Sequence, residues 1–466
     1  MVSALAPGGA RAVARCDELG IAPYSDLPDS LYRGYLTPAH RAALDRVGAW
    51  MVEAGMRVRI DPAANLIGRY EATAPDAPAL IIASHIDSVR DGGRYDGPLG
   101  IMLGIEAVAA LQGRRLPFAI EVIAFGDEEG SRFPAAMLTS RAVAGALDAS
   151  ALDMVDAHGV SVAEALAEMG LDVAKYLTAA RAPGTTLAYL EAHIEQGPLL
   201  EAEGIAVGTV TGIAAQLRYE ITVAGTAGHA GTTSMPLRRD ALAGAAEMIL
   251  AVETIAGAAA SDLVATVGRI EASPGAANVI PGSVTFTLDV RAGDAARRDE
   301  AAADILETIR VIAGKDTPRP SPFPFPYPSS FPREGGAPGL QAIPFVAPGP
   351  PLSRGNGARD DVANRNLDVA ITLIHDLPAS PCDPALMDLL DAATAAAGQP
   401  IRRLVSGAGH DAMVMAALCP TAMLFIRCRG GISHNPAEHV DPADAQIALA
   451  VMSGFIDRLG ATIDPA

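Results

Sequence analysis

The sequence predicts an α/β protein: one domain built around a mainly parallel sheet, with a smaller βαββαβ domain inserted into it. In the first half, short and continuously apolar runs alternate with helical stretches, which is typical of strands buried on both faces of a parallel sheet. From about residue 212 the order changes to strand, helix, two strands, helix and strand, and near Cys382 the first pattern returns. The 466 residues also exceed what one core supports, since cores stop growing at about 250–300 residues.

Two helices are predicted in the first half of the chain. Residues 38–59 have apolar side chains three or four positions apart, which indicates a helix that closes at Gly55. A second helix is expected from Leu99 to about Leu111.

Three apolar runs in the same half are predicted to be buried strands, and each ends in polar residues. PALIIASH ends at His85, FAIEVIAFGDEE ends at Glu128 and Glu129, and TLAYLEAH ends at His193. Ligands of parallel α/β sheets bind outside the carboxyl ends of the strands. The polar residues therefore lie where a site is expected.

The inserted domain is predicted to cover residues 212–381, and residues 1–211 with 382–466 form the other domain. Its six elements are expected at 218–225, 239–256, 264–272, 283–292, 299–314 and 367–376. The order strand, helix, strand, strand, helix, strand indicates a small ferredoxin-like sheet with helices on one face.

A proline-rich segment interrupts this domain between about residues 315 and 366. Alternating prolines, as in SPFPFPYPSSFP, cannot complete a β ladder and favour an extended, solvated chain. We expect a flexible excursion, which is either an inert insertion or sequencing artefact, or a polyproline II segment that binds a partner.

Charge and cysteine content exclude several classes of protein. The net charge is −19, so the chain repels phosphate backbones and we expect no nucleic acid partner. Four cysteines without a CxxC pair do not form a disulfide framework. The N-terminus has no long apolar run, and the apolar stretch 412–426 is too short to span a membrane. We expect a cytoplasmic protein with no membrane partner.

Histidines and carboxylates gather in five short motifs, which are ASHIDSV, GGRYDGPLG, GDEEGSRF, EAHIEQG and GGISHNPAE. Imidazole and carboxylate groups are the ligands of divalent metals such as zinc. Taken singly, each motif has an ordinary structural explanation: a satisfied histidine, a solvated pair of glutamates, or an aspartate in a turn. Surface carboxylates seldom follow a buried strand immediately, however, and the combination indicates a metal site.

Together these motifs resemble the amidohydrolase branch of the M20 metallopeptidase family. That branch holds N-carbamoyl-L-amino acid amidohydrolases, β-ureidopropionases of one type and allantoate amidohydrolases. The resemblance runs in register from about Tyr35 to the C-terminus and fails only across the proline-rich segment. It implies two divalent metal ions per subunit, zinc or manganese, and a homodimer formed through a lid-like inserted domain.

The resemblance also implies roles at the metal site. The implied metal ligands are His85, Asp96, Glu129, His193 and His434. Asp96 would bridge the two ions, and Asp87 would orient the imidazole of His85 without itself binding a metal. Glu128 would be the general base, and the alternatives are a third ligand or an idle neighbour.

Further residues are implied to contact the substrate. His229, in GTAGHAGTT, would stabilise the tetrahedral oxyanion from the dimer partner; its alternative is an ordinary loop histidine. Arg291 would bind a substrate carboxylate through its planar fork, and otherwise it is a cation at the end of a strand. The other implied substrate-binding residues are Gln196, Asn278, Gly409 and His410.

The expected substrate is a small ureido carboxylate. Arg427 and Cys428 precede GGISH, as in allantoate amidohydrolases, where carbamoylases more often have a small hydroxyl residue. This favours hydrolysis of allantoate to ureidoglycine, ammonia and carbon dioxide. The alternatives are an N-carbamoyl-L-amino acid amidohydrolase or β-ureidopropionase, an M20 peptidase proper, and a non-catalytic binding member.

Overall fold

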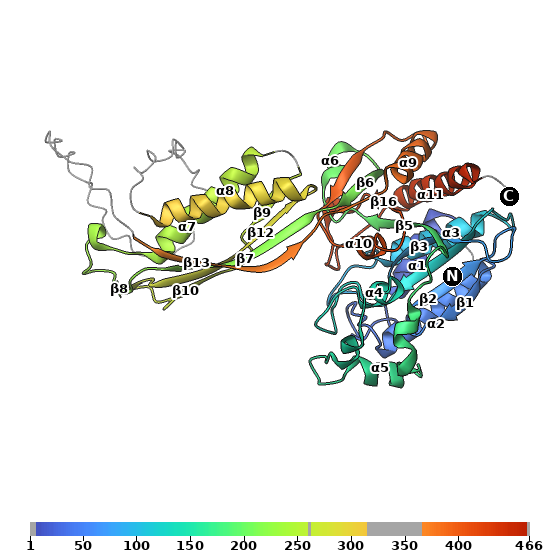
Figure 1. The fold of residues 1–466 in the computed structure, drawn as a ribbon, viewed down its shortest axis with the longest axis horizontal. Helices are drawn as coiled ribbons and strands as arrows, with labels where there is room; N and C mark the ends of the chain where they lie inside the picture. The colour runs from blue at the N-terminus through green and yellow to red at the C-terminus, as the bar shows by residue number, and fades with distance from the viewer. Residues whose placement is uncertain (1–5, 260–261, 315–365, 464–466) are drawn as a thin grey trace, which may run out of the picture. The chain divides into compact units, whose positions relative to one another are not determined.

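The computed structural model describes residues 6–259, 262–314 and 366–463 (Figure 1). The chain forms two compact units. The first is made of Met1–Gln216, Arg291–Ala295 and Leu377–Ala466, and the second of Leu217–Val290 and Ala296–Asp376. Of the proline-rich segment expected at 315–366, all but Asn366 lies outside the described residues.

The first unit is built on a mixed sheet with a parallel centre. Its strand order is β1-β2-β4-β3-β5-β16-β6-β14, and β15 pairs with β6. The four central strands, β4, β3, β5 and β16, run parallel to one another, and antiparallel pairs flank them on both sides. The predicted α/β fold with a mostly parallel central sheet is confirmed. The strands are β1 (Arg57–Ile60), β2 (Leu66–Tyr70), β3 (Ala79–His85), β4 (Ala119–Phe125), β5 (Thr186–Ile194), β6 (Val207–Ile213), β14 (Ser380–Pro381), β15 (Arg403–Ser406) and β16 (Thr421–Ile426).

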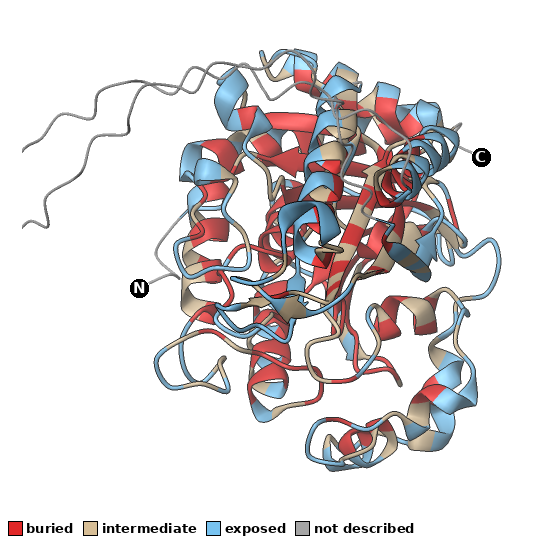
Figure 2. Cartoon of the chain, turned by 90° about the vertical axis from the view of Figure 1, so that its left-hand side faces the viewer, coloured by how far each residue is buried: buried red, intermediate tan, exposed pale blue. Residues whose placement is uncertain are grey.

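Hydrophobic side chains on both faces explain why the central strands are apolar throughout. Every residue of β3 and β4 is buried. Because side chains alternate along a strand, Leu80 and Ile82 join one core cluster, whereas Ile81 and Ala83 join another on the opposite face. Figure 2 shows that the buried residues lie in the interior, on strands and on the inner faces of helices.

Helices and short helical turns complete the first unit. The α-helices are α1 (Gly9–Leu19), α2 (Pro38–Glu53), α3 (Pro98–Ala110), α4 (Leu138–Val143), α5 (Val162–Glu168), α6 (Leu199–Glu203), α9 (Pro384–Ala396), α10 (Asp411–Met415) and α11 (Pro442–Thr462). Short 3-10 helices occupy Ala149–Asp153, Val173–Ala179 and Arg429–Gly431. Of these helices, α1, α3 and α11 pack against one another, and α3 lies on β3, β4 and β5.

The predicted helix end at Gly55 is confirmed, whereas the last residues of the predicted stretch form a strand. The helix expected over residues 38–59 ends at Glu53, and Gly55 follows with a φ of 86°. That left-handed conformation ends the helix, and the chain then pairs as β1 with β2 in antiparallel register. The helix expected from Leu99 to Leu111 is present as α3.

The second unit has the order strand, helix, two strands, helix, strand. These elements are β7 (Ala215–Ala224), α7 (Ala241–Ala258), β9 (Val264–Thr266) with β10 (Ile270–Ser273), β12 (Ser283–Ala292), α8 (Ala295–Ala313) and β13 (Asp368–Leu377). The strand expected at 264–272 is divided into β9 and β10, both of which pair with β12. A 3-10 helix (Met235–Leu237) and a short sheet of β8 (Gly228–His229) and β11 (Val279–Ile280) complete the unit.

Both helices of the second unit pack on one face of its sheet, whose order is β10-β12-β7-β13 (Figure 1). Alternate residues of β12, such as Phe286 and Leu288, share a core cluster with Met248 of α7 and Ile305 of α8. Among the helices within the described residues, α7 alone is long and apolar enough to cross a membrane. It contributes Met248 to a protein core, so by itself this is weak support for a membrane span.

Candidate metal centre

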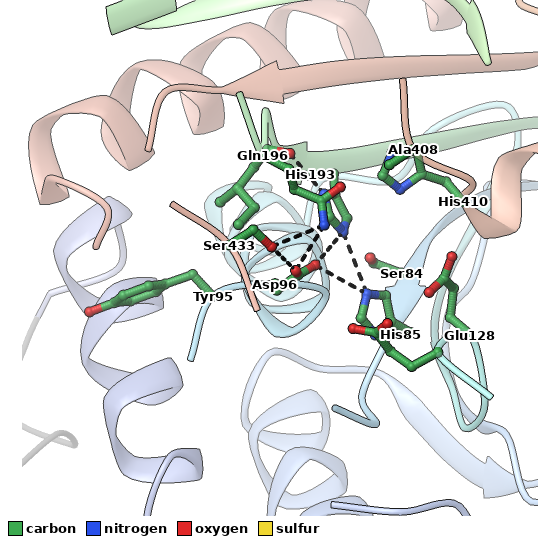
Figure 3. A network of polar contacts seen from close by, with 12 residues as sticks. Ser84, His85, Tyr95, Asp96, Glu128, His193, Gln196, Ala408, His410 and Ser433 are labelled. Carbon is green, nitrogen blue, oxygen red and sulfur yellow. Dashed lines mark hydrogen bonds and ion pairs between the residues drawn. The ribbon is translucent and has the colours of Figure 1, made fainter. Parts of the chain in front are cut away.

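The five residues predicted to bind metal come together in the first unit, around the carboxylate of Asp96. Figure 3 shows Asp96 with His85 and His193 beside it. Asp96 Oδ1 lies 3.0 Å from His193 Nε2 and 3.5 Å from His85 Nε2. The other oxygen, Oδ2, lies 3.3 Å from His434 Nε2, which in turn lies 3.2 Å from Glu129 Oε1. Asp96 therefore occupies the position between two groups of donors.

The sheet positions these donors. His85 is the last residue of β3, His193 lies on the neighbouring strand β5, and Glu129 follows β4. Asp96 lies in the loop that leads into α3. A Cβ at Gly97, the next residue, would lie 2.5 Å from the His85 ring, so only glycine lets this loop approach the histidine.

Two residues near Asp96 have left-handed backbone conformations that are unusual for residues other than glycine. Their φ angles are 57° at Gln196 and 54° at His434. Such conformations cost on the order of 1–3 kcal/mol and persist where the surroundings enforce them, often at functional sites. Here the Gln196 amide donates to Asp96 Oδ2 at 2.9 Å and to Ser433 Oγ at 3.1 Å.

Asp87 connects His85 with the two glutamates. Its Oδ1 lies 3.4 Å from His85 Nδ1 and accepts the backbone N–H of Glu128 at 3.1 Å. Its Oδ2 accepts the backbone N–H of Glu129 at 3.2 Å. Asp87 is fully buried, so one carboxylate fixes both the imidazole and the loop that carries the paired glutamates.

The hydrogen bonds of the two buried histidines leave lone pairs for a cation. His85 Nδ1 lies 3.2 Å from the Asp87 carbonyl oxygen, and His193 Nδ1 lies 2.9 Å from the Ile194 carbonyl oxygen. An imidazole that donates through Nδ1 presents the lone pair of Nε2. The two Nε2 atoms face each other at 3.5 Å beside the Asp96 carboxylate. Two lone pairs and a carboxylate directed at one space suit a divalent cation, so the donor set fits the implied metals.

Neighbouring groups at the site shift the pKa values of His434 and Glu128. Hydrogen bonds to Asp96 and Glu129 raise the pKa of His434 to about 10. Burial raises the pKa of Glu128 well above its usual range, and the nearby carboxylates of Glu129, Asp411 and Asp87 raise it further. Several carboxyl groups therefore lie close together, and a bound cation would favour their ionised forms.

Three of the predicted substrate-binding residues lie on the segment after β15 or beside it. Arg291, at the end of β12, donates from Nη1 to the Gly407 carbonyl oxygen at 2.5 Å. Gly409 and His410 follow, and the buried His410 ring packs edge-on against that of His193 with centroids 4.4 Å apart. Burial lowers the pKa of His410 well below its usual range, which keeps the ring neutral.

The structure groups the remaining two predicted residues with each other. His229 and Asn278 both belong to the second unit, where β8 pairs with β11. The backbone N–H of Ala230 donates to the Asn278 carbonyl oxygen at 2.9 Å, and His229 is exposed. The first unit thus holds the donor cluster, and the second holds this histidine and asparagine.

Sequence reasoning missed three polar residues that touch the site or its supports. Ser433 donates its hydroxyl to Asp96 Oδ2. Glu438 accepts backbone hydrogen bonds from the Asp96 loop. Glu191 accepts hydrogen bonds from Ser84 Oγ at 3.0 Å and from the backbone N–H of Ala412 at 3.1 Å. All three lie in motifs that contain a predicted ligand, but residue type alone assigns them no partner.

Known proteins resemble this chain along most of its length. The sequence profile of peptidase family M20/M25/M40 matches residues 81–458. An N-carbamoyl-L-amino acid amidohydrolase from Geobacillus stearothermophilus is 38% identical over 418 residues, which are 89% of this chain and 90% of that protein. An allantoate deiminase from Arabidopsis thaliana is 37% identical over 478 residues, or 96% of this chain and 81% of that protein.

A solved structure agrees with the sequence comparison. The crystal structure of an amidase of the hydantoinase/carbamoylase family from Burkholderia multivorans superposes with a TM-score of 0.80 at 32% identity and covers 96% of this chain and 97% of that one. The profile match spans most of the chain, including Asp96 and the four other predicted ligands. The chain therefore belongs to peptidase family M20.

Proposed function

We propose that this M20 member is a metal-dependent amidohydrolase that cleaves a ureido C–N bond, with allantoate as its substrate. The products would be ureidoglycine, ammonia and carbon dioxide. The observation that carries this proposal is the donor cluster around Asp96 with Glu128 beside it. The names of the relatives, which refer to allantoate and to N-carbamoyl amino acids, support a ureido substrate.

The metal ligands would be His85, Asp96, Glu129, His193 and His434, with Asp96 shared between two divalent ions. Zinc and manganese both accept imidazole and carboxylate ligands, and availability often decides between them. When bound, the ions supply polarisation of the substrate carbonyl and a water of lowered pKa.

Glu128 is the proposed proton carrier. One of its carboxylate oxygens lies within 4.8 Å of donor atoms of His85 and Glu129, so the group borders the cluster. Burial and the neighbouring carboxylates raise the pKa of Glu128, which makes its ionised carboxylate a stronger base. Glu128 would take a proton from the attacking water at its carboxylate and deliver that proton to the leaving nitrogen.

Substrate recognition is proposed for residues of both units. Arg291, held against the Gly407 carbonyl, would bind the substrate carboxylate, with Gln196, Gly409 and His410 beside it. His229 would stabilise the oxyanion, and Asn278 would contact the substrate.

His229 is further proposed to serve the site of the other subunit in a homodimer formed through the second unit, which would act as a lid. Size-exclusion chromatography of the full chain tests this. A dimer would also indicate that the insertion at 315–366 is tolerated, whereas a monomer would remove the partner role of His229. The enzyme is proposed to be cytoplasmic.

The second candidate is an N-carbamoyl-L-amino acid amidohydrolase. The Geobacillus relative supports it, since its identity of 38% is similar to the 36% and 37% of two allantoate deiminases. Both substrates carry a ureido group and a carboxylate, so the donor cluster serves either. Arg427 and Cys428 are what favour allantoate within the chain itself.

The deciding experiment measures ammonia release by the purified, manganese-supplemented protein. Allantoate is assayed beside a panel of N-carbamoyl-L-amino acids. Faster turnover of allantoate supports the proposal. Faster turnover of a carbamoyl amino acid keeps the metal chemistry and replaces the substrate, and no turnover of either favours a non-catalytic member.

A further inference from the structure

Glu438 holds the loop that carries Asp96. Its Oε1 accepts the backbone N–H of Tyr95 at 2.7 Å and that of Asp96 at 3.0 Å. Two consecutive N–H groups bound to a single oxygen fix the orientation of the intervening peptide. The direction in which the Asp96 side chain leaves the backbone is fixed as a result.

The loop approaches Glu438 as closely as a glycine allows. A Cβ at Gly93 would lie 2.2 Å from both the carboxyl carbon and Oε2 of Glu438. Atoms cannot lie that close together, so a side chain at Gly93 would separate the Glu438 carboxylate from the loop.

A turn brings Glu438 back toward the loop. The backbone N–H of Glu438 donates to the Asn435 carbonyl oxygen at 3.0 Å, and that of Ala437 donates to Asn435 Oδ1 at 2.9 Å. The same segment, residues 433–438, therefore contacts Asp96 in three ways. Ser433 and His434 reach its side chain, and Glu438 reaches its backbone.

A contribution to fold stability does not explain why a carboxylate is buried at position 438. Glu438 is 5% exposed, and among the described residues its Oε2 has no hydrogen-bond partner and no basic side chain forms an ion pair with it. A buried and incompletely paired carboxylate lowers stability. Residues that break such local rules are expected at functional sites.

We infer that Glu438 is a positioning residue for the metal centre, which sets the Asp96 backbone so that its carboxylate can be shared between two ions. The inference rests on the proposed role of Asp96 as a metal ligand. It goes beyond that role because Glu438 would tune metal affinity through hydrogen bonds to backbone amides, without contact with the metals.

The test is titration of Co²⁺ into the metal-free protein, followed by its visible absorption. Glu438→Ala removes the oxygen that accepts both hydrogen bonds and should weaken Co²⁺ binding by about 10–100-fold. Glu438→Gln keeps an acceptor oxygen at the same reach and should stay within about threefold of the parent. Glu438→Asp keeps the charge but shortens the reach, and should resemble Glu438→Ala.

Asp61→Ala is the matched control. Asp61 is also buried, at 2% exposed, and its Oδ1 also accepts two backbone N–H groups, those of Ala63 and Asn65 at 2.8 and 2.9 Å. Its loop joins β1 to β2 and carries no proposed ligand. Loss of Asp61 should lower stability and leave Co²⁺ affinity unchanged.

The outcomes separate the two proposals. If the parent protein takes up no Co²⁺, the proposed metal chemistry fails and this inference fails with it. If the parent binds Co²⁺ and Glu438→Ala binds it equally well with the same absorption spectrum, only the role of Glu438 is overturned. If Glu438→Ala does not fold, the other two variants decide. Equal Co²⁺ affinities of Glu438→Gln and Glu438→Asp would contradict the inference, because only the glutamine side chain is long enough to accept the two backbone N–H groups.

Discussion

The guanidinium of Arg427 forms two hydrogen bonds with the carboxylate of Asp444, at 2.8 and 2.7 Å. Arg427 directly follows β16, and Asp444 lies in the first turn of α11. The pair therefore ties the end of a central strand to the C-terminal helix. The arginine that favours allantoate in the sequence is engaged in a structural contact.

Replacement of Arg427 by serine is expected to lower stability and to leave substrate preference nearly unchanged. Removal of two charge-assisted hydrogen bonds beside the buried Asp444 should reduce the free energy of unfolding by about 1–3 kcal/mol. The ratio of kcat/KM for allantoate to that for an N-carbamoyl amino acid should change less than about threefold. Urea unfolding and ammonia release measure the two quantities. A large swing in preference at unchanged stability would place Arg427 in substrate recognition.

Glu128→Gln should abolish turnover while the metal content stays nearly unchanged. Glutamine has similar size but cannot take a proton from the attacking water, so kcat should fall by about 10²–10⁴-fold. Metal analysis of the purified variant by mass spectrometry accompanies the rate measurement.

Glu129→Gln is the control for that variant. Because Glu129 lies 3.2 Å from His434 and is a proposed ligand, its replacement should lower metal content together with activity. If Glu128→Gln loses metal to the same extent, Glu128 is a ligand and the general-base assignment is wrong.

The central strands and the residues at their ends were predictable, because a strand buried on both faces is a run of apolar residues that can be recognised in the sequence. ALIIASH is apolar on both faces, so its strand and the position of His85 at its end follow from the pattern alone. The strand RVRI (57–60) has exposed and half-buried side chains, and its pairing with β2 decides its conformation. The local pattern therefore gave the helix end at Gly55 but did not show that the residues after it form a strand.

Ser433 and Glu438, which hydrogen-bond to Asp96, were not predictable for a different reason. Ser433 meets Asp96 across 337 positions, and Glu438 meets it across 342. No local pattern encodes such contacts, since any serine or glutamate beside a ligand is equally consistent with solvent exposure. Only the turn at Asn435 and the space left by Gly93 bring Glu438 to the loop.

Chelation should reduce both activity and stability, and divalent metal should restore them. A ligand at 100 times its dissociation constant stabilises the native state by about 2.7 kcal/mol, provided that the unfolded chain does not bind it. The melting temperature should therefore rise as Mn²⁺ is titrated into the chelator-treated protein. Asp96→Asn should remove most of this gain because it replaces the carboxylate that is proposed to bind both ions. A melting temperature that does not respond to Mn²⁺, Zn²⁺ or Co²⁺ would contradict the metal centre.

Arg291→Ala should raise KM for substrates that carry a carboxylate. Loss of a charge-assisted interaction of about 1.5–3 kcal/mol corresponds to a 10–100-fold increase. Arg291→Lys should recover only part of the affinity, because an ammonium group cannot make a bidentate contact. The matched substrate is an N-carbamoyl amine that lacks the carboxylate, for which the parent and Arg291→Ala should have similar kcat/KM. Equal losses on both substrates would instead mean that the Arg291 contact with Gly407 holds the segment before His410 in place, and that the guanidinium does not bind the substrate.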